Sequence, residues 1–169
     1  AYDVANTPNI KAIKSILTQT IKTDDFVIIE DGPLTKDLDK VIKKHQKKHP
    51  EIKVIPLENN VGLGLALNRG VKECKHRLIA RIDADDISVP NRMEEQLKVF
   101  KQNKNLSAVG TLAIEFTNSI NEIKGYATFP ETNEEIIKYA KKRNPICHPS
   151  IMFKKQSVIS AGNYQNCHL

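Results

Sequence analysis

Apolar and polar positions in the first hundred residues alternate between the spacing of helices and the spacing of strands. Apolar residues three or four apart predict helices at 7–20, 38–45, 63–74 and 90–100. Short apolar runs between them predict buried strands at 26–29, 52–57 and 77–82. The connections are short, and such strand–helix alternation favours a largely parallel sheet flanked by helices, the α/β class.

The remaining third of the chain has a different pattern. The run LSAVGTLAIEF (106–116) predicts a long strand, and 118–125 has the polar composition of a hairpin-type turn. Thr132 and Glu135 have the spacing of a capping box before a helix, and HPSIMF (148–153) predicts a final strand. We expect residues 1–169 to form one domain whose second half is smaller and mixed or antiparallel.

Acidic residues gather where two of the predicted strands end. Asp83, Asp85 and Asp86 follow the strand at 77–82, and Glu30-Asp31 follows the strand at 26–29. Ligands of open parallel sheets bind beyond the carboxyl ends of the strands, so parallel neighbours would bring both turns to one edge.

Three carboxylates within four residues suit a hard divalent cation, because Mg²⁺ and Mn²⁺ take oxygen ligands. In an extended segment, Asp83 and Asp85 would point the same way. The alternative is an acidic N-terminus of the helix that begins near Pro90, although a cap needs one acid rather than three.

A glycine-containing loop, NNVGLGLALN (59–68), precedes the third predicted helix. Glycines at 62 and 64 would let the backbone approach a ligand closely, and a helix N-terminus favours anions. Two glycines alone are a weak signal, and a plain turn remains the alternative.

The net charge of +6 is concentrated in six lysines between Lys36 and Lys48. A solvated helix face explains this run most simply, and an anionic membrane surface or a polyanionic partner is the alternative. Aromatic residues make up only 5% of the chain, which disfavours base stacking, so we expect no nucleic-acid partner. Three cysteines without a C-x-x-C pair favour a reducing compartment, and we expect a cytoplasmic protein in peripheral contact with the inner face of the membrane.

Four motifs together resemble a known enzyme family. They are DGP (31–33), NNVGLGLALNRGV (59–71), IARIDADDISVPNRMEEQ (79–96) and HPSIMF (148–153). Their order and spacing resemble the inverting family-two nucleotide-sugar glycosyltransferases with the GT-A fold. The resemblance is to the bacterial branch that builds exopolysaccharide, capsule or lipopolysaccharide, such as the amylovoran-type transferases. DADD in this context is specific for the family, and each of the other three motifs is moderately specific.

The resemblance implies a UDP-sugar or similar donor, bound with Mg²⁺ or Mn²⁺. Asp85 and Asp86 match the pair that touches the ribose and holds the metal on the diphosphate, and Asp83 would lie beside the donor sugar. Residues 1–104 would then form the nucleotide-sugar-binding half, and 105–169 would begin the acceptor half.

Four further positions match donor-site residues of that family. Asp31 would hydrogen-bond the nucleotide base, and Tyr2 would lie near it. Asn68 and Arg81 fall where donor-site neighbours are found. The simpler alternatives are that Asn68 caps a turn and that Arg81 pairs with an acid.

The implied reaction is a single displacement that transfers the sugar, with inversion, to a glycan or lipid-linked acceptor. The acceptor hydroxyl needs a general base. The family supplies that base in an acidic motif expected beyond Leu169, and its first strand should precede Tyr2, so the chain looks truncated at both ends. His148 is the substitute to weigh, and a satisfied, partly buried histidine is the simpler interpretation. The alternatives are a nucleotidyltransferase that uses the same acid-bound metal and a non-catalytic anion-binding module.

Overall fold

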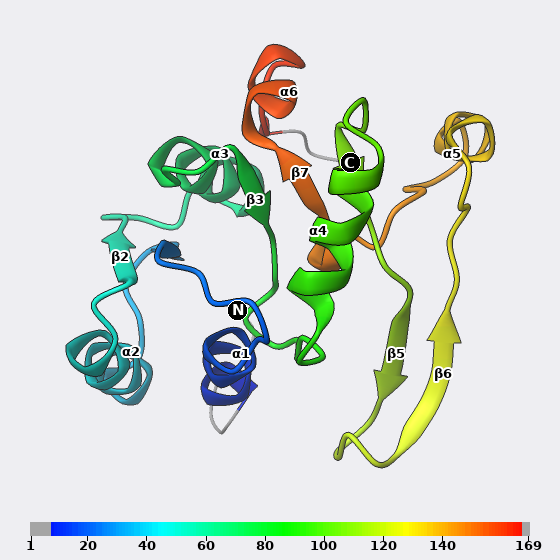
Figure 1. The fold of residues 1–169 in the computed structure, drawn as a ribbon. Helices are drawn as coiled ribbons and strands as arrows, with labels where there is room; N and C mark the ends of the chain where they lie inside the picture. The colour runs from blue at the N-terminus through cyan, green and yellow to red at the C-terminus, as the bar shows by residue number, and fades with distance from the viewer. Residues whose placement is uncertain (1–7, 167–169) are drawn as a thin grey trace.

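The computed structural model describes residues 8–166 as an α/β fold (Figure 1). The first part contains α1 (Pro8–Leu17), β1 (Phe26–Glu30), α2 (Lys36–Lys48), β2 (Ile52–Pro56), α3 (Leu63–Glu73), β3 (Leu78–Ala80) and α4 (Arg92–Gln102). The second part contains β4 (Ala108–Val109), β5 (Ala113–Phe116), β6 (Ile123–Ala127), α5 (Asn133–Ala140), the 3₁₀ turn η1 (His148–Ser150), β7 (Met152–Lys154) and α6 (Lys155–Ser160). The α/β class and all four helices expected in the first part are confirmed.

The described strands form three small sheets. β1 and β2 pair in parallel, β3-β7-β4 is antiparallel, and β5-β6 is an antiparallel hairpin. β7, from near the end of the chain, lies between β3 and β4, and Figure 1 shows it beside β3. The parallel pairing is therefore confirmed for β1 and β2, whereas β3, which precedes the three aspartates, pairs with β7.

Apolar side chains from α1, α2 and β2 form the core of the first part. Ile13, Ile42 and Ile52 are each about 95% buried and pack together. Six partly buried side chains surround them: Leu17, Phe26, Ile28, Leu34, Leu38 and Val54. On the other side, α3 packs against β1, where a Cβ at Gly70 would come within 3.4 Å of Ile29. Burial of the predicted helical and strand faces therefore accounts for the layered arrangement.

The long strand expected at 106–116 is wrong, because it breaks at Gly110. A Cβ there would lie 2.6 Å from Cγ2 of Ile146, and the amide of Thr111 donates to Ser150 Oγ at 2.9 Å instead of joining a sheet. The chain therefore leaves β4 and enters β5 in a different sheet.

Two other expectations in the second part are corrected in detail. HPSIMF begins as a 3₁₀ turn, and only its last residues enter β7. The expected turn at 118–125 is shorter, because β6 begins at Ile123. The capping box is confirmed: Thr132 and Glu135 exchange side-chain and backbone hydrogen bonds at the start of α5.

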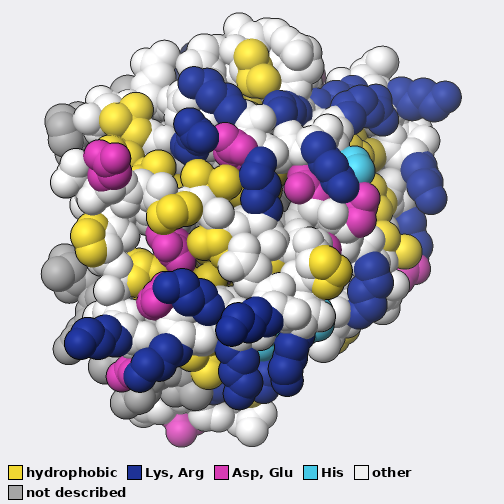
Figure 2. All heavy atoms as spheres, turned by 90° about the vertical axis from the view of Figure 1, so that its left-hand side faces the viewer, with side chains coloured by type: hydrophobic (Ala, Val, Ile, Leu, Met, Phe, Trp, Pro, Cys, Tyr) yellow, Lys and Arg dark blue, Asp and Glu magenta, His cyan; other side chains and the backbone are white. Residues whose placement is uncertain are grey.

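The lysine run lies on an exposed face of α2. Figure 2 shows Lys and Arg side chains gathered in the lower part of the face that carries this helix. Asp39 and Asp37 lie on the same helix and pair with Lys43 at 2.7 Å and Lys40 at 3.5 Å. The run thus has the features of a solvated helix face. Within residues 8–166, none of the helices has the length and apolarity needed to span a bilayer.

Candidate functional site

The three aspartates that follow β3 lie together in a short, partly exposed turn, here called the acid turn (82–87). Asp83, Asp85 and Asp86 each present a carboxylate oxygen, and these oxygens lie within 4.8 Å of one another. The amide of Asp86 donates to the carbonyl of Asp83 at 3.3 Å, which curls the segment back on itself. The sequence-predicted cluster is therefore a real convergence of oxygen ligands.

Electrostatic repulsion in the acid turn is only partly offset. Burial raises the pKa of Asp86 above its usual value, and the negative charges of Asp85 and Asp83 raise it further. Arg81 and Arg92 act in the opposite direction. A cation that entered the turn would relieve this repulsion.

Arg81 supplies one positive charge beside the acid turn. It is only 6% exposed, and its Nη2 forms an ion pair with Asp83. Its Nε and Nη1 are buried and have no hydrogen-bond partner among residues 8–166. Arg81 therefore pairs with an acid and also keeps unused donor groups.

Asp31, after β1, is joined to the glycine loop. Its two carboxylate oxygens accept from the amides of Val61 at 2.7 Å and Gly62 at 3.1 Å. Gly32, with φ 91°, packs so closely on this loop that a Cβ would lie 2.7 Å from the amide nitrogen of Asn60. The carboxylate thus orients the loop, and each oxygen retains capacity for one further hydrogen bond.

The glycine loop contacts the end of the described chain. A Cβ at Gly64 would clash with the carbonyl oxygen of Gln165, and Asn68 Nδ2 donates to the carbonyl of Tyr164 at 2.7 Å. The close backbone approach predicted for this loop is therefore made to residues 164–166. The side chain of Asn68 holds the same segment.

His148 contacts a residue that the sequence did not point to. Its Nε2 lies 3.0 Å from the hydroxyl of Tyr164, and both side chains are partly buried. Burial lowers the pKa of His148, and the positive charge of Arg81 lowers it further. The simpler interpretation, a satisfied histidine, matches this geometry. Nothing in the spacing of these two residues would have paired them.

A layer of buried polar side chains lies beneath the acid turn and was also missed. It comprises Ser15 from α1, Gln19 just after that helix, Ser88 from the connection, and Arg92 and Gln96 from α4, all 7% exposed or less. Arg92 and Gln96 are four residues apart on the helix face that carries the buried Phe100. A polar pair inside an apolar face was the available signal.

Tyr2, the remaining predicted donor-site residue, lies outside the described residues. The candidate site residues within the described part of the chain come from four segments: the acid turn with Arg81, the loop of Asp31, the glycine loop, and the segment of His148.

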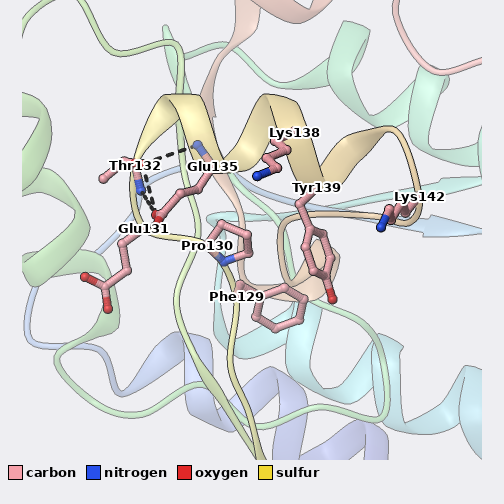
Figure 3. A pocket seen from close by; sticks show the side chains of 8 residues that line it. All are labelled: Phe129, Pro130, Glu131, Thr132, Glu135, Lys138, Tyr139 and Lys142. Carbon is pink, nitrogen blue, oxygen red and sulfur yellow. Dashed lines mark hydrogen bonds between the residues drawn. The ribbon is translucent and has the colours of Figure 1, made fainter.

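Two large cavities lie away from these acids, in the second part of the chain. One, of about 640 Å³, is drawn in Figure 3; Phe129 and Tyr139 face it, with Lys138 and Lys142 at its rim. Another, of about 440 Å³, is mainly apolar in lining and shares Phe129, Pro130 and Glu131 with the first. It extends to Cys147, the neighbour of His148, so the cavities approach the candidate site from the side of α5.

Residues 10–160 match the model of the family described as glycosyl transferase family 2. The chain is 35% identical over 156 residues to the amylovoran biosynthesis glycosyltransferase AmsE of Erwinia amylovora, covering 92% of this chain and 58% of the relative. It is 36% identical over 159 residues to an Escherichia coli UDP-Gal:alpha-D-GlcNAc-diphosphoundecaprenol beta-1,3-galactosyltransferase, covering 94% and 57%. The chain thus spans a little over half the length of these relatives.

The fold is similar to that of the mannosyltransferase PcManGT from Pyrobaculum calidifontis, solved in complex with GDP-Man and Mn²⁺. The TM-score is 0.66 at 14% identity, over 96% of this chain and 45% of that one. This similarity confirms the expected GT-A fold.

Proposed function

This chain belongs to glycosyl transferase family 2, and from that membership we propose that it binds the donor in a nucleotide-sugar glycosyltransferase. The donor is a nucleotide-diphosphate sugar, with UDP as the nucleotide. The sugar passes with inversion to a glycan or lipid-linked acceptor in bacterial surface polysaccharide synthesis. The observation that carries the proposal is the convergence of three carboxylates at the end of β3.

The acid turn has the chemistry of a site for Mg²⁺ or Mn²⁺. Its three ligand groups are carboxylate oxygens, which hard divalent ions prefer, and they lie close enough to meet around one ion. Asp85 and Asp86 would hold the ion. When bound, such an ion neutralises negative charge that develops on the leaving diphosphate.

The surrounding side chains would orient the donor. Asp31 has spare acceptor capacity for the N–H of a base, next to a loop that it holds by two hydrogen bonds. Asp83, fixed by Arg81, would accept a hydrogen bond from a hydroxyl of the donor sugar. The unpaired N–H groups of Arg81 suit an oxygen-rich ligand. Tyr2 and Asn68 complete the proposed donor set; Asn68 would act by holding residues 163–164 beside the loop.

The second part of the chain, from residue 105, would begin the acceptor side. Its cavities combine aromatic rings with lysine and glutamate side chains, and aromatic faces and charged hydrogen-bonding groups both suit saccharides. A relative's printed name specifies a diphosphoundecaprenol-linked acceptor. A lipid-linked acceptor would bring the protein, from the cytoplasm, into peripheral contact with the membrane, where the lysines of α2 could meet anionic lipid.

The base that removes the proton from the acceptor hydroxyl is proposed to lie beyond Leu169. Nε2 of His148 already lies 3.0 Å from the hydroxyl of Tyr164, so this nitrogen has a partner within the chain.

Product analysis tests the proposal. The full-length protein is incubated with UDP-sugars, Mn²⁺ and extracts of lipid-linked saccharide, and the released nucleotide is identified. Glycosyl transfer releases free UDP, and the product carries an inverted anomeric centre. In a parallel incubation with UTP and a sugar phosphate, release of pyrophosphate would instead identify a nucleotidyltransferase. Absence of both products with every nucleotide sugar, despite a folded protein, would favour a non-catalytic binding module.

A further inference from the structure

Arg92, the first residue of α4, spans the two ends of the acid turn from below. Its Nη2 donates to the carbonyl of Arg81, where β3 has just ended, at 2.6 Å. Its Nη1 donates to Ser88 Oγ, beyond the last aspartate, at 2.9 Å. A single planar guanidinium thus joins the residues that bracket all three carboxylates, and it does so while only 6% exposed.

The remaining contacts of Arg92 fix the guanidinium itself. Its Nε donates to Oε1 of Gln96 at 3.1 Å, and Nη2 lies 3.5 Å from the carbonyl of Ile151. The side-chain amide of Gln96 in turn donates, through Nε2, to the carbonyls of Val109 and Ser150, at 3.0 and 2.8 Å. The position of Arg92 is therefore set by α4, by β4 and by the segment that leads into β7.

The far end of the turn is held a second time, by Ser15 of α1 and by Gln19, which follows that helix. The amide of Ser88 donates to Ser15 Oγ at 3.1 Å, and Gln19 Nε2 donates to the carbonyl of Val89 at 2.7 Å. Gln19 Oε1 also accepts from the amide of Met93 at 3.0 Å. Both ends of the turn are thus anchored in buried polar groups, while its centre is open to solvent.

Arg92 forms no salt bridge with any of residues 8–166, although it is a buried cation. Burial lowers its pKa to about 10, so it still carries its charge at neutral pH, and the negative charge of Asp86 favours that charged form. A buried charge without an ion-pair partner is expensive, and an apolar side chain would fill the same space more cheaply. The hydrogen bonds of Arg92 to the acid turn, and its positive charge beneath that turn, explain why an arginine occupies this position.

We propose that Arg92 is a positioning residue that holds the acid turn in the conformation in which its three carboxylates converge. Its planar fork reaches both ends of the turn at once, which a lysine cannot do from the same position. The geometric part of this proposal is independent of the function proposed above; only its consequence for metal affinity rests on that function.

Hydrogen exchange on the metal-free protein tests the geometric part. Arg92→Met removes the fork and the charge at similar volume. We expect amides of the peptide covering 81–89 to exchange at least ~10-fold faster, while those of α2 keep the wild-type rate, because only the local opening becomes easier. Ser150→Ala is the matched control: it removes three hydrogen bonds of Ser150 Oγ, one buried to Cys147 and two part-buried to Thr111, that do not involve the turn.

The comparison has a definite contrary result. If Arg92→Met exchanges in 81–89 no faster than Ser150→Ala, Arg92 only fills a polar position in the core and the proposal is overturned. If Arg92→Met does not fold, Arg92→Lys decides by the same measurement, because it keeps the charge and loses only the fork. Arg92→Lys is then expected to loosen the same peptide, and wild-type exchange in it would overturn the proposal.

Mn²⁺ affinity, measured by the electron paramagnetic resonance signal of free Mn²⁺, tests the consequence. We expect Arg92→Met to bind Mn²⁺ at least ~10-fold more weakly than Ser150→Ala, because the ligands must be reassembled before binding. Arg92→Lys should be intermediate. If hydrogen exchange is faster in Arg92→Met but the wild-type protein binds no Mn²⁺, the positioning role stands and the proposed function is rejected. Undiminished Mn²⁺ affinity in Arg92→Met would reject the positioning role.

Discussion

The acid turn and the hairpin–α5 region (112–143) are built on opposite principles. The acid turn exposes charged groups above a buried layer in which the polar side chains of Gln19, Arg92 and Gln96 have hydrogen-bond partners. The hairpin–α5 region exposes apolar groups instead: Leu112, Ile114, Tyr126 and Ile137 are each more than half exposed. None of the residues of α5 is buried. An isolated two-stranded hairpin is only marginally stable, so little in the described chain fixes this region.

This difference fits the two roles proposed above, a metal and donor site for the acid turn and an acceptor side for the hairpin–α5 region. A site for an ion and a diphosphate needs ligands fixed within fractions of an ångström, which a buried hydrogen-bonded base provides. The hairpin–α5 region, proposed above to belong to the acceptor side, instead offers a cavity lined by aromatic and charged side chains. We therefore expect substitutions in the acid turn to abolish chemistry without unfolding the protein. Substitutions in the hairpin–α5 region should change acceptor use.

The largest effect is expected from the acid turn itself. Asp85→Asn and Asp86→Asn should each reduce the rate of sugar transfer by the full-length protein by roughly 100-fold or more, because charge on the leaving group loses its electrostatic stabilisation. Asp39→Asn changes a partly exposed aspartate of α2 that pairs with Lys43; it is the control and should retain the wild-type rate. Equal rates in all three variants would remove the acid turn from the chemistry.

The next effect concerns stability and contrasts two aromatic residues. Phe153 in β7 is 2% exposed and lies between β3 and β4, so Phe153→Ala should lower the free energy of unfolding by about 3–5 kcal/mol. Tyr126 on β6 is 70% exposed, and Tyr126→Ala should change it by less than about 0.5 kcal/mol. Urea titrations would measure both. A large loss at Tyr126 would mean that the hairpin is part of the cooperative core.

Much of this division could be predicted from the sequence, since periodicity identified the helices of the first part and the DADD run identified the ligand cluster. The break at Gly110 could not be predicted, because it depends on a contact with Ile146, 36 residues away along the chain. The same holds for β7, which joins β3 and β4 through long-range pairing that no local pattern encodes.

The supporting residues of the site were missed for a related reason. The polar pair of Arg92 and Gln96 inside an apolar helix face was a weak signal, and the roles of this pair and of Gln19 appear only when their partners in other elements are known. Tyr164 likewise meets His148 only in three dimensions. Sequence identified the three carboxylates of the acid turn, and structure identified the groups that hold them.

A smaller effect is expected in the cavity of Figure 3. Tyr139→Ala removes one of its two aromatic walls and should raise the KM for the acceptor by about 10-fold, the value of one lost aromatic contact, while the KM for the donor stays unchanged. Tyr126→Ala serves as the control, because Tyr126 is outside the residues that line this cavity. An equal rise in both KM values would place the effect on the whole enzyme rather than on an acceptor site.

The smallest effect is a pH dependence of stability. Because burial lowers the pKa of His148, the folded protein disfavours its charged form, and stability should fall as the pH drops below the ordinary value of 6.5 and through the lowered pKa. Above pH 6.5 this contribution vanishes. His148→Asn should flatten the curve of stability against pH between pH 7 and 5. His45 has a lowered pKa for the same main reason, so His45→Asn should remove a separate part of the slope.

Calorimetric titration with UDP, in the presence and absence of Mn²⁺, tests the central claim most directly. Wild-type protein should bind UDP at least ~10-fold more tightly when Mn²⁺ is present, and Asp86→Asn should lose this enhancement while retaining its fold. An enhancement by Mn²⁺ that survives in both Asp85→Asn and Asp86→Asn would contradict the claim that these carboxylates hold the ion that accompanies the donor.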